Sequence, residues 1–119
     1  MVIPPPLDET RRAELAMSLE GEVFTDIATR MCYATDASIY QQLPLAVVYP
    51  KHGADCAAIM EFSLRHSLPI IPRAAGTSLA GQCVGSGLVV DVTRHMNQVL
   101  EVDPDGMRVR AQPGIIMLA

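Results

Sequence analysis

Tryptophan is absent from this sequence of 119 residues, and cysteine occurs only three times. Cys32, Cys56 and Cys83 are an odd and widely spaced set without a Cys-x-x-Cys pair, which is typical of reduced cytoplasmic thiols rather than of a disulfide framework. The first ten residues lack a basic start followed by an apolar stretch, so the sequence predicts no secretory signal peptide. No apolar run approaches the roughly 20 residues that a membrane-spanning helix needs.

Basic residues are also scarce: nine Lys and Arg stand against thirteen Asp and Glu, which gives a formal net charge of −4. Because nucleic acids and anionic membranes are bound through basic faces, this balance argues against both as partners. Half of the residues are hydrophobic and 18% are charged, so we expect one packed domain. The residues from Gly114 to the end are apolar and carry no stop signal, and we expect the chain to be a fragment.

The first part of the chain is predicted to be mainly helical. Residues 4–6 are three prolines that predict a stiff, extended lead. Residues 8–20 form an expected helix, with acidic residues at its start and Gly21 as its stop. Residues 27–31 extend the helical material, and residues 32–45 are expected to be an irregular loop.

The middle of the chain predicts a parallel sheet. Residues 46–49 and 69–72 are short apolar runs, and residues 53–66 between them have one apolar helical face, with His52 as the expected N-cap. A strand, a helix and a strand in this order describe a βαβ unit with a right-handed crossover. Residues 88–92 are a third buried strand, which we expect to lie beside and parallel to 69–72 with the helix packed on the sheet.

The last part of the chain predicts a short helical turn over residues 93–97 and a β-hairpin over 99–111. Pro-Asp-Gly at 104–106 is a turn sequence, because proline fixes its own φ angle and glycine adopts backbone angles that other residues avoid. The expected fold class is therefore α/β, with a small parallel βαβ sheet, flanking helices and a β-hairpin.

A loop of small residues follows the second predicted strand. Seven of the ten residues in 73–82 are Gly, Ala, Ser or Thr, so the backbone can approach a ligand closely. Successive N–H groups in such a loop form a concave nest for a phosphate, while Thr77 and Ser78 add hydroxyl donors and Arg73 adds a positive charge. The loop matches neither GxxxxGK[ST] nor GxGxxG. From composition alone, a tight connection whose small residues serve only packing stays open as an alternative.

Three segments together resemble a known family. They are LAVVYPKHGADCAAIMEFSLRHSLP, the loop PIIPRAAGTSLAGQ, and GLVVDVTRHMNQVLEVDPDGMRVRAQPGI. In this order and spacing they are similar to the start of the PCMH-type FAD-binding domain of FAD-linked oxidases, flavoproteins of the vanillyl-alcohol-oxidase type. The D-lactate and glycolate dehydrogenase branch looks most similar. The resemblance implies an N-terminal helical lead over residues 1–30 and an incomplete FAD-binding domain over residues 31–119.

The resemblance also implies an FAD site in which each segment has a role. Leu79, Gly81 and Gln82 would continue along the cofactor toward the flavin, and Pro113 and Gly114 would lie near the adenosine end. The pyrophosphate would be wrapped by main-chain N–H groups of the residues Arg73, Ala74, Ala75, Gly76, Thr77 and Ser78. The family has glycine at Ala74 and often at Ala75, so both must keep a negative φ. Some members attach the flavin to a His whose position matches Thr77, so non-covalent FAD is expected.

Other polar residues have simpler expected roles. His52 and Cys56 are four residues apart, but no further ligand is close in the sequence, so we expect a cap and a small core residue and no metal site. We expect Asp91 to be solvated at the end of its strand and His95 to be exposed. Asp36 is expected to stabilise a turn.

The function that the resemblance implies is that of an FAD-dependent oxidoreductase acting on a CH–OH group. In such enzymes a hydride moves from the α-carbon of a 2-hydroxy acid to the flavin. We expect this chain to supply part of the FAD site and to be inactive alone, because a separate substrate domain carries the catalytic base. The expected location is cytoplasmic, with a peripheral membrane association of the parent enzyme left open.

Two alternative functions stay open at this point. One is a stand-alone nucleotide- or phosphate-binding module without redox chemistry. The other is an inert fragment that self-associates through an exposed apolar face, made up of Ile115, Ile116, Met117 and Leu118.

Overall fold

The computed structural model describes residues 3–117, so Leu118 of the predicted apolar face lies outside the described residues. The helices are α1 (Glu9–Met17), α2 (Ile27–Cys32) and α3 (Gly53–His66). The strands are β1 (Glu22–Phe24), β2 (Ala46–Tyr49), β3 (Ile70–Arg73), β4 (Leu88–Asp91), β5 (Val99–Asp103) and β6 (Arg108–Ala111).

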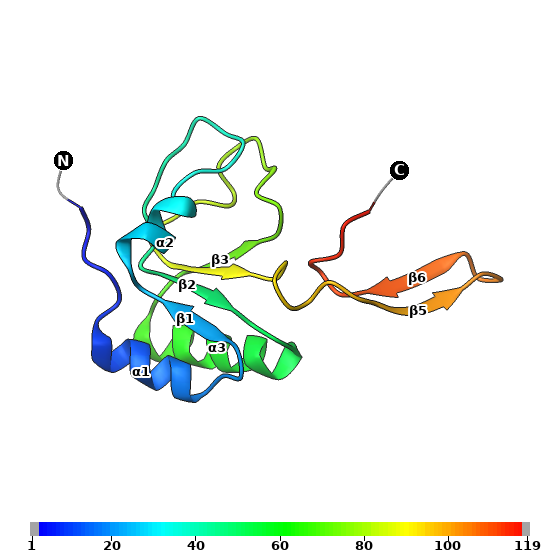
Figure 1. Cartoon of the computed structure of the whole chain (residues 1–119), viewed down its shortest axis with the longest axis horizontal. Coiled ribbons are helices and arrows are strands. Elements are labelled where there is room, and N and C mark those ends of the chain that lie inside the picture. Colours follow the sequence, from blue (N-terminus) through cyan, green and yellow to red (C-terminus); the bar gives the residue numbers. More distant parts are fainter. Residues whose placement is uncertain (1–2, 118–119) are drawn as a thin grey trace.

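Strands β1 to β4 form a mixed sheet with the order β1-β2-β4-β3 (Figure 1). β4 lies between β2 and β3 and is parallel to both, whereas β1 is antiparallel to β2. Every residue of β2 and β4 is buried, as expected for parallel strands that are covered on both faces. The α/β class is confirmed, and so is the parallel pairing of residues 70–73 with 88–91.

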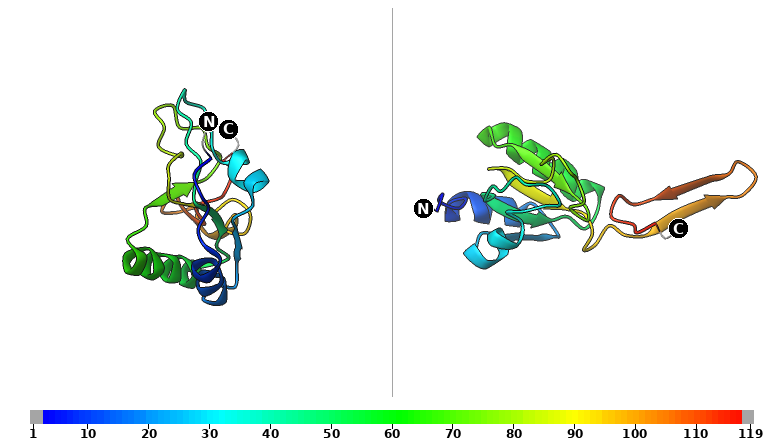
Figure 2. Two further views of the ribbon diagram at one scale, coloured as in Figure 1. Left: turned by 90° about the vertical axis from the view of Figure 1, so that its left-hand side faces the viewer. Right: turned by 90° about the horizontal axis from the view of Figure 1, so that it is seen from above.

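Helices α1 and α3 lie together on one face of the sheet (Figure 2). Alternate residues of the strands point toward them, because side chains along a strand alternate between the two faces. Each fully buried aliphatic or aromatic side chain stabilises the fold by roughly 1.5–3 kcal/mol. The buried cluster on this face comprises Leu7, Leu15, Ala46, Val48, Ile59, Phe62, Leu88 and Val90.

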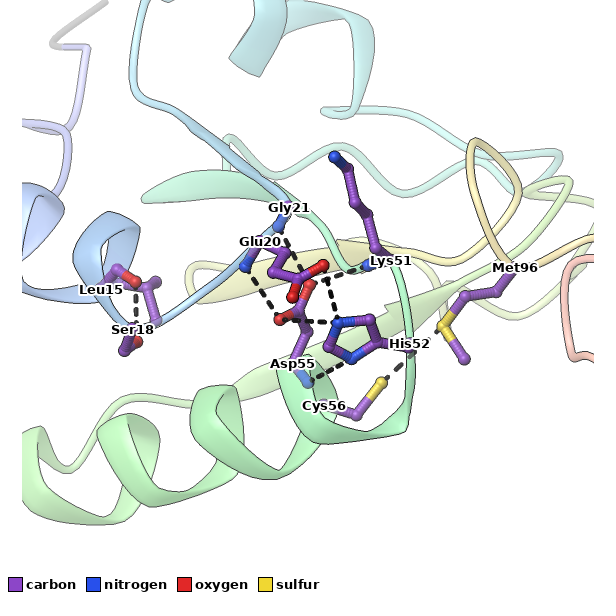
Figure 3. A network of polar contacts seen from close by, with 9 residues as sticks. All are labelled: Leu15, Ser18, Glu20, Gly21, Lys51, His52, Asp55, Cys56 and Met96. Atoms are coloured by element: carbon purple, nitrogen blue, oxygen red, sulfur yellow. Dashed lines mark hydrogen bonds and ion pairs between the residues drawn. The ribbon is translucent and has the colours of Figure 1, made fainter.

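Figure 3 shows how the link between α1 and β1 is fastened to the start of α3. The carboxylate of Asp55, a residue that is 2% exposed, accepts hydrogen bonds from three backbone N–H groups. These belong to Glu20 (3.0 Å), Gly21 (3.0 Å) and Lys51 (2.9 Å). Burial by itself raises the pKa of Asp55, but the three donors outweigh it and the net pKa is lowered. His52 is the N-cap of α3, as predicted, and its Nδ1 accepts the Asp55 N–H at 3.4 Å.

The sequence prediction fails at two points near the N-terminus. Helix α1 ends at Met17 rather than at Glu20, because the N–H and the hydroxyl of Ser18 both donate hydrogen bonds to the carbonyl of Leu15 in the last turn. Gly21 is therefore not the helix stop; it lies against the carbonyl of Tyr49, where a side chain has no room. Strand β1 was not predicted, and it forms by pairing with the edge of β2.

The segments after β4 are largely as predicted. Residues 93–97 contain a single helical turn, in which the Met96 N–H donates to the Val92 carbonyl at 3.1 Å. Strands β5 and β6 form the expected hairpin, which projects from the body of the molecule (Figure 1). The expectation of an exposed His95 is wrong: its side chain is 26% exposed and lies 2.7 Å from the carboxylate of Glu22 in β1.

Candidate functional site

A pocket of about 840 Å³ opens at the carboxyl ends of β3 and β4. In parallel sheets this edge is where ligands bind. Its walls come from the end of α2, the residues after β3, the turn after β4 and the segment after β6. The lining residues are Cys32, Tyr33, Arg73, Ala74, Ala75, Asp91, Thr93, Asn97, Gly114, Ile115 and Ile116.

The loop after β3 has a backbone shape that only small residues allow. Gly76 has a φ of +69° and Gly81 a φ of +81°, values that glycine adopts at little cost. Ala74 and Ala75 are not among the residues with positive φ. Their methyl groups are therefore accommodated without backbone strain, as the prediction required.

The same loop presents a row of free backbone donors. Within residues 3–117, none of the six N–H groups from Ala74 to Leu79 donates a hydrogen bond to another group of the chain. Backbone N–H groups require a partner, either water or a ligand. Successive free N–H groups at the end of a strand suit an anion, because their partial positive charges add.

The segment of residues 33–42 holds this loop from outside, and the two rise side by side in Figure 1. The Ala37 N–H donates to the carbonyl of Gly76 at 3.0 Å. The Cys83 N–H donates to Oδ2 of Asp36 at 3.3 Å, while Oδ1 of Asp36 accepts the Ser38 N–H at 2.8 Å. Asp36 therefore stabilises a turn, as predicted, and it also ties the two segments together.

Arg73 points back into the base of the loop. Its Nη1 donates to the backbone carbonyls of Thr35 at 2.8 Å and Cys83 at 3.2 Å. Its Cζ lies 5.1 Å from the centre of the Tyr33 ring, within the range of a cation–π contact. The predicted positive charge is thus at the pocket, although part of the guanidinium is occupied by main-chain carbonyls.

Asp91 and Tyr33 form a polar network on the pocket wall. Asp91 is 6% exposed, so the expectation of a solvated carboxylate is wrong. Its Oδ1 accepts the N–H and the hydroxyl of Thr93 at 2.7 and 2.6 Å, and its Oδ2 accepts the Tyr33 hydroxyl at 2.6 Å. The Tyr33 hydroxyl also lies 2.9 Å from that of Tyr49. Burial, together with the hydrogen bond to Asp91, raises the pKa of Tyr33.

The structure brings four predicted site residues together at the pocket: Arg73, Ala74, Ala75 and Gly114. The others lie in the loop or beside the pocket without lining it. Leu79 is 80% exposed, and Thr77, Gln82 and Pro113 are also exposed. Those outside the lining are Gly76, Thr77, Ser78, Leu79, Gly81, Gln82 and Pro113.

Sequence reasoning missed several lining residues. Asp91 and Thr93 follow a buried strand, and the rule that ligands bind at the carboxyl edge of a parallel sheet could have pointed to them. Cys32 and Tyr33 carried no such signal, because 58 residues separate Tyr33 from its partner Asp91. Only the folded chain places them side by side.

Within residues 3–117, no three His, Cys, Asp or Glu side chains gather in a way that could hold a metal ion. No helix in this range is long and apolar enough to cross a membrane.

Known proteins with similar sequences match most of this chain. An E. coli D-2-hydroxyglutarate dehydrogenase is 41% identical over 99 residues, which are 81% of this chain and 10% of that protein. A Bacillus subtilis glycolate oxidase subunit GlcD is 39% identical over 93 residues, 76% of this chain and 20% of that protein. The chain thus spans between a tenth and a fifth of the length of these relatives.

Solved structures share the fold. An alkyldihydroxyacetonephosphate synthase superposes with a TM-score of 0.82 at 20% identity, over 98% of this chain and 24% of that chain. The 6-hydroxy-D-nicotine oxidase of Arthrobacter nicotinovorans gives a TM-score of 0.71 at 26% identity, over 84% of this chain and 22% of that chain. Residues 44–119, more than half of the chain, match the FAD binding domain family. The chain therefore belongs to the FAD binding domain family, as the resemblance of its strands and loop predicted.

Proposed function

We propose that this chain is the pyrophosphate-binding part of the FAD site in an FAD-dependent 2-hydroxy-acid dehydrogenase or oxidase. The observation that carries the proposal is the row of free N–H groups from Ala74 to Leu79 in a chain of this family. The names of relatives supply the substrate class: D-2-hydroxyglutarate, glycolate and D-lactate are all 2-hydroxy acids.

The residues present fit FAD. A pyrophosphate carries negative charge and many acceptor oxygens, and the loop offers N–H donors beside the guanidinium of Arg73. Gly76 and Gly81 have a positive φ, so the loop conformation that presents these donors requires residues without a side chain at both positions. In this proposal, Leu79, Gly81 and Gln82 continue toward the flavin, and Pro113 and Gly114 approach the adenosine end.

Bound FAD supplies the hydride acceptor, and the chain supplies position and electrostatics. Among the described lining residues, Asp91 is the single carboxylate, and it is held by Thr93 and Tyr33. It therefore serves as a fixed acceptor that shapes the pocket rather than as a mobile base. We accordingly propose that the chain alone does not catalyse the oxidation.

Non-covalent attachment is part of the proposal. The resemblance places Thr77 where some family members carry the flavin-bearing His, and a threonine hydroxyl is a poor substitute in that chemistry. Acid precipitation of flavin-loaded protein should release all of the yellow colour into the supernatant. Colour that stays in the pellet would contradict this part of the proposal.

Titration of the 119-residue chain, followed by amide chemical shifts in NMR, tests the pyrophosphate assignment. FAD, ADP and inorganic pyrophosphate should each shift the amides of Ala74 to Ser78, while riboflavin, which lacks phosphate, should not. In this proposal the chain supplies only part of the cleft, so the flavin ring stays in water and only pyrophosphate contacts remain to offset an association cost of several kcal/mol. We therefore expect a dissociation constant above about 1 μM for FAD. Sub-micromolar binding would contradict the proposal that the chain holds only part of the FAD site, and shifts confined to other regions would contradict the pyrophosphate assignment.

The same titration tests the first alternative. A stand-alone phosphate-binding module would bind ADP or pyrophosphate tightly, and it would bind FAD no more tightly than ADP. The second alternative, self-association, has one observation behind it: the side chains of Ile116 and Met117 are 78% and 90% exposed. Sedimentation of the wild-type chain and of Ile116→Ser at rising concentrations decides it, since only a contact through this face weakens in the variant.

A further inference from the structure

The Arg73 guanidinium occupies space that Gly76 leaves open. A Cβ built on Gly76 would lie 2.6 Å from Nη2 of Arg73, so the guanidinium would have to shift to admit a side chain at position 76. The positive φ of Gly76 disfavours a side chain there independently.

The guanidinium also joins the two segments that form the loop region. One nitrogen, Nη1, bridges the carbonyl of Thr35 in segment 33–42 and the carbonyl of Cys83 at the far end of the loop. The Tyr33 ring, held by Asp91, contacts it as well. No carboxylate lies within ion-pair distance of Arg73 in the part of the chain that the structure describes.

A loop of small residues has little core of its own to fix its shape. Arg73 fixes the shape of the loop from beneath. Its guanidinium donates to the carbonyl of Thr35 in segment 33–42 and to that of Cys83 at the end of the loop, and the N–H groups of residues 74–79 stay unoccupied. An arginine suits this role better than a lysine, because its planar guanidinium lies against the Tyr33 ring while one of its nitrogens donates to both carbonyls.

We propose that Arg73 is a positioning residue: its guanidinium fills the space beneath Gly76 and fastens the loop to residues 33–42, so that the loop N–H groups remain free for an anion. The anion part of this inference rests on the proposed function. The packing part does not, and it is tested without a ligand.

A double-mutant cycle in urea unfolding tests the packing part. Gly76→Ala should lower the folding equilibrium constant both in the wild-type background and in the Arg73→Ala background. The factor should be about five times larger in the wild-type background, since contacting residues couple to this extent. Gly81→Ala is the matched control, because Gly81 also has a positive φ but its Cβ would meet Tyr40, at 2.7 Å. Its factor should be the same in both backgrounds. Equal factors for Gly76→Ala in both backgrounds would overturn the proposal.

A measurement on the wild-type chain covers the case in which a variant fails to fold. Nuclear Overhauser contacts should join the side-chain protons of Arg73 to the Hα protons of Gly76 and to the ring of Tyr33. Their absence in a chain with assigned resonances would also overturn the proposal.

Inorganic pyrophosphate tests the anion part. Arg73→Lys keeps the charge but lacks the planar guanidinium that lies against Tyr33 and beneath Gly76, so it should lose the pyrophosphate-induced shifts as completely as Arg73→Gln does. Full retention by Arg73→Lys with loss in Arg73→Gln would show that Arg73 acts as a charge on the phosphate, which overturns the positioning role. If wild-type chain shows no pyrophosphate shifts, the proposed function fails, while the unfolding cycle still decides the packing role.

Discussion

Removal of one hydroxyl at the pocket wall tests how much the polar network stabilises the fold. Tyr33→Phe keeps the ring, and with it the contact to Arg73, but removes the donor to Asp91 and the acceptor for Tyr49. A hydrogen bond to a charged group contributes about 1.5–3 kcal/mol. Because Tyr33 is only half-buried and Asp91 keeps its two bonds to Thr93, we expect the lower part of this range, about 1.5 kcal/mol less unfolding free energy.

Tyr49→Phe is the matched control, since its hydroxyl contacts that of Tyr33 and reaches no carboxylate in the described residues. A neutral hydrogen bond contributes about 0.5–1.5 kcal/mol, so this variant should lose less. The double variant should lose less than the sum of the two, because both single changes remove the same hydrogen bond between the two hydroxyls and the double variant loses it only once. Urea unfolding at neutral pH measures all four proteins. A Tyr33→Phe chain as stable as wild type would refute the reasoning.

The pH dependence gives a second check on the same residue. The pKa of Tyr33 is raised in the folded chain, so the folded state retains this proton more tightly than the unfolded state does. The corresponding stability is present below the ordinary tyrosine pKa of about 10 and is lost as the pH rises through the folded value. Unfolding free energy should therefore fall above about pH 10, and fall less steeply in Tyr33→Phe. Equal alkaline slopes would contradict the raised pKa.

Three further predictions concern other positions. Asp55→Ala leaves three backbone donors without their carboxylate and should lower the unfolding free energy in urea by about 2–4 kcal/mol. Because the pKa of Asp55 is lowered in the folded chain, this stabilisation is present above about pH 4 and disappears as the pH falls through the folded pKa. Unfolding measured over a series of acidic pH values should show this loss. Gly114→Ala would press a methyl group onto backbone carbonyls and should cost about 1–3 kcal/mol, whereas Gly53→Ala, with nothing within 4 Å at the start of α3, should be neutral or stabilising by thermal unfolding. If the chain is part of a longer flavin enzyme, as proposed, Gly76→Val in that enzyme should abolish flavin retention and Cys83→Ser should leave it nearly intact. Full flavin absorbance per folded chain in the Gly76 variant would contradict the assignment.

The strands of the parallel sheet were predictable because their signal is local. β2 and β4 are short apolar runs that are buried on both faces, and α3 between them has a recognisable cap and an apolar face. β1 was not predictable in this way. Its three residues, one of them a glutamate, take the strand conformation because the edge of β2 is available to pair with them.

The candidate site was predictable only in part, for a related reason. Its small-residue loop is a local pattern and could be recognised. Tyr33 and Asp91, by contrast, meet across 58 residues of sequence, and the burial of Asp91 depends on that meeting. A solvated carboxylate is the usual state for an aspartate at a strand end, and here the tertiary contact overrides it.

The conformation of the loop depends on residues outside it. Its own side chains are too small to form a core, and the N–H groups from Ala74 to Leu79 make no internal hydrogen bonds among the described residues. Contacts from outside must therefore select one conformation, and they come from residues 33–42 and from Arg73. It follows that substitutions in 33–42, a segment that precedes the residues matched to the family, should change anion binding without contacting the anion. A loop whose N–H groups from Ala74 to Leu79 are kept free can bind a phosphate only if other parts of the chain maintain its shape.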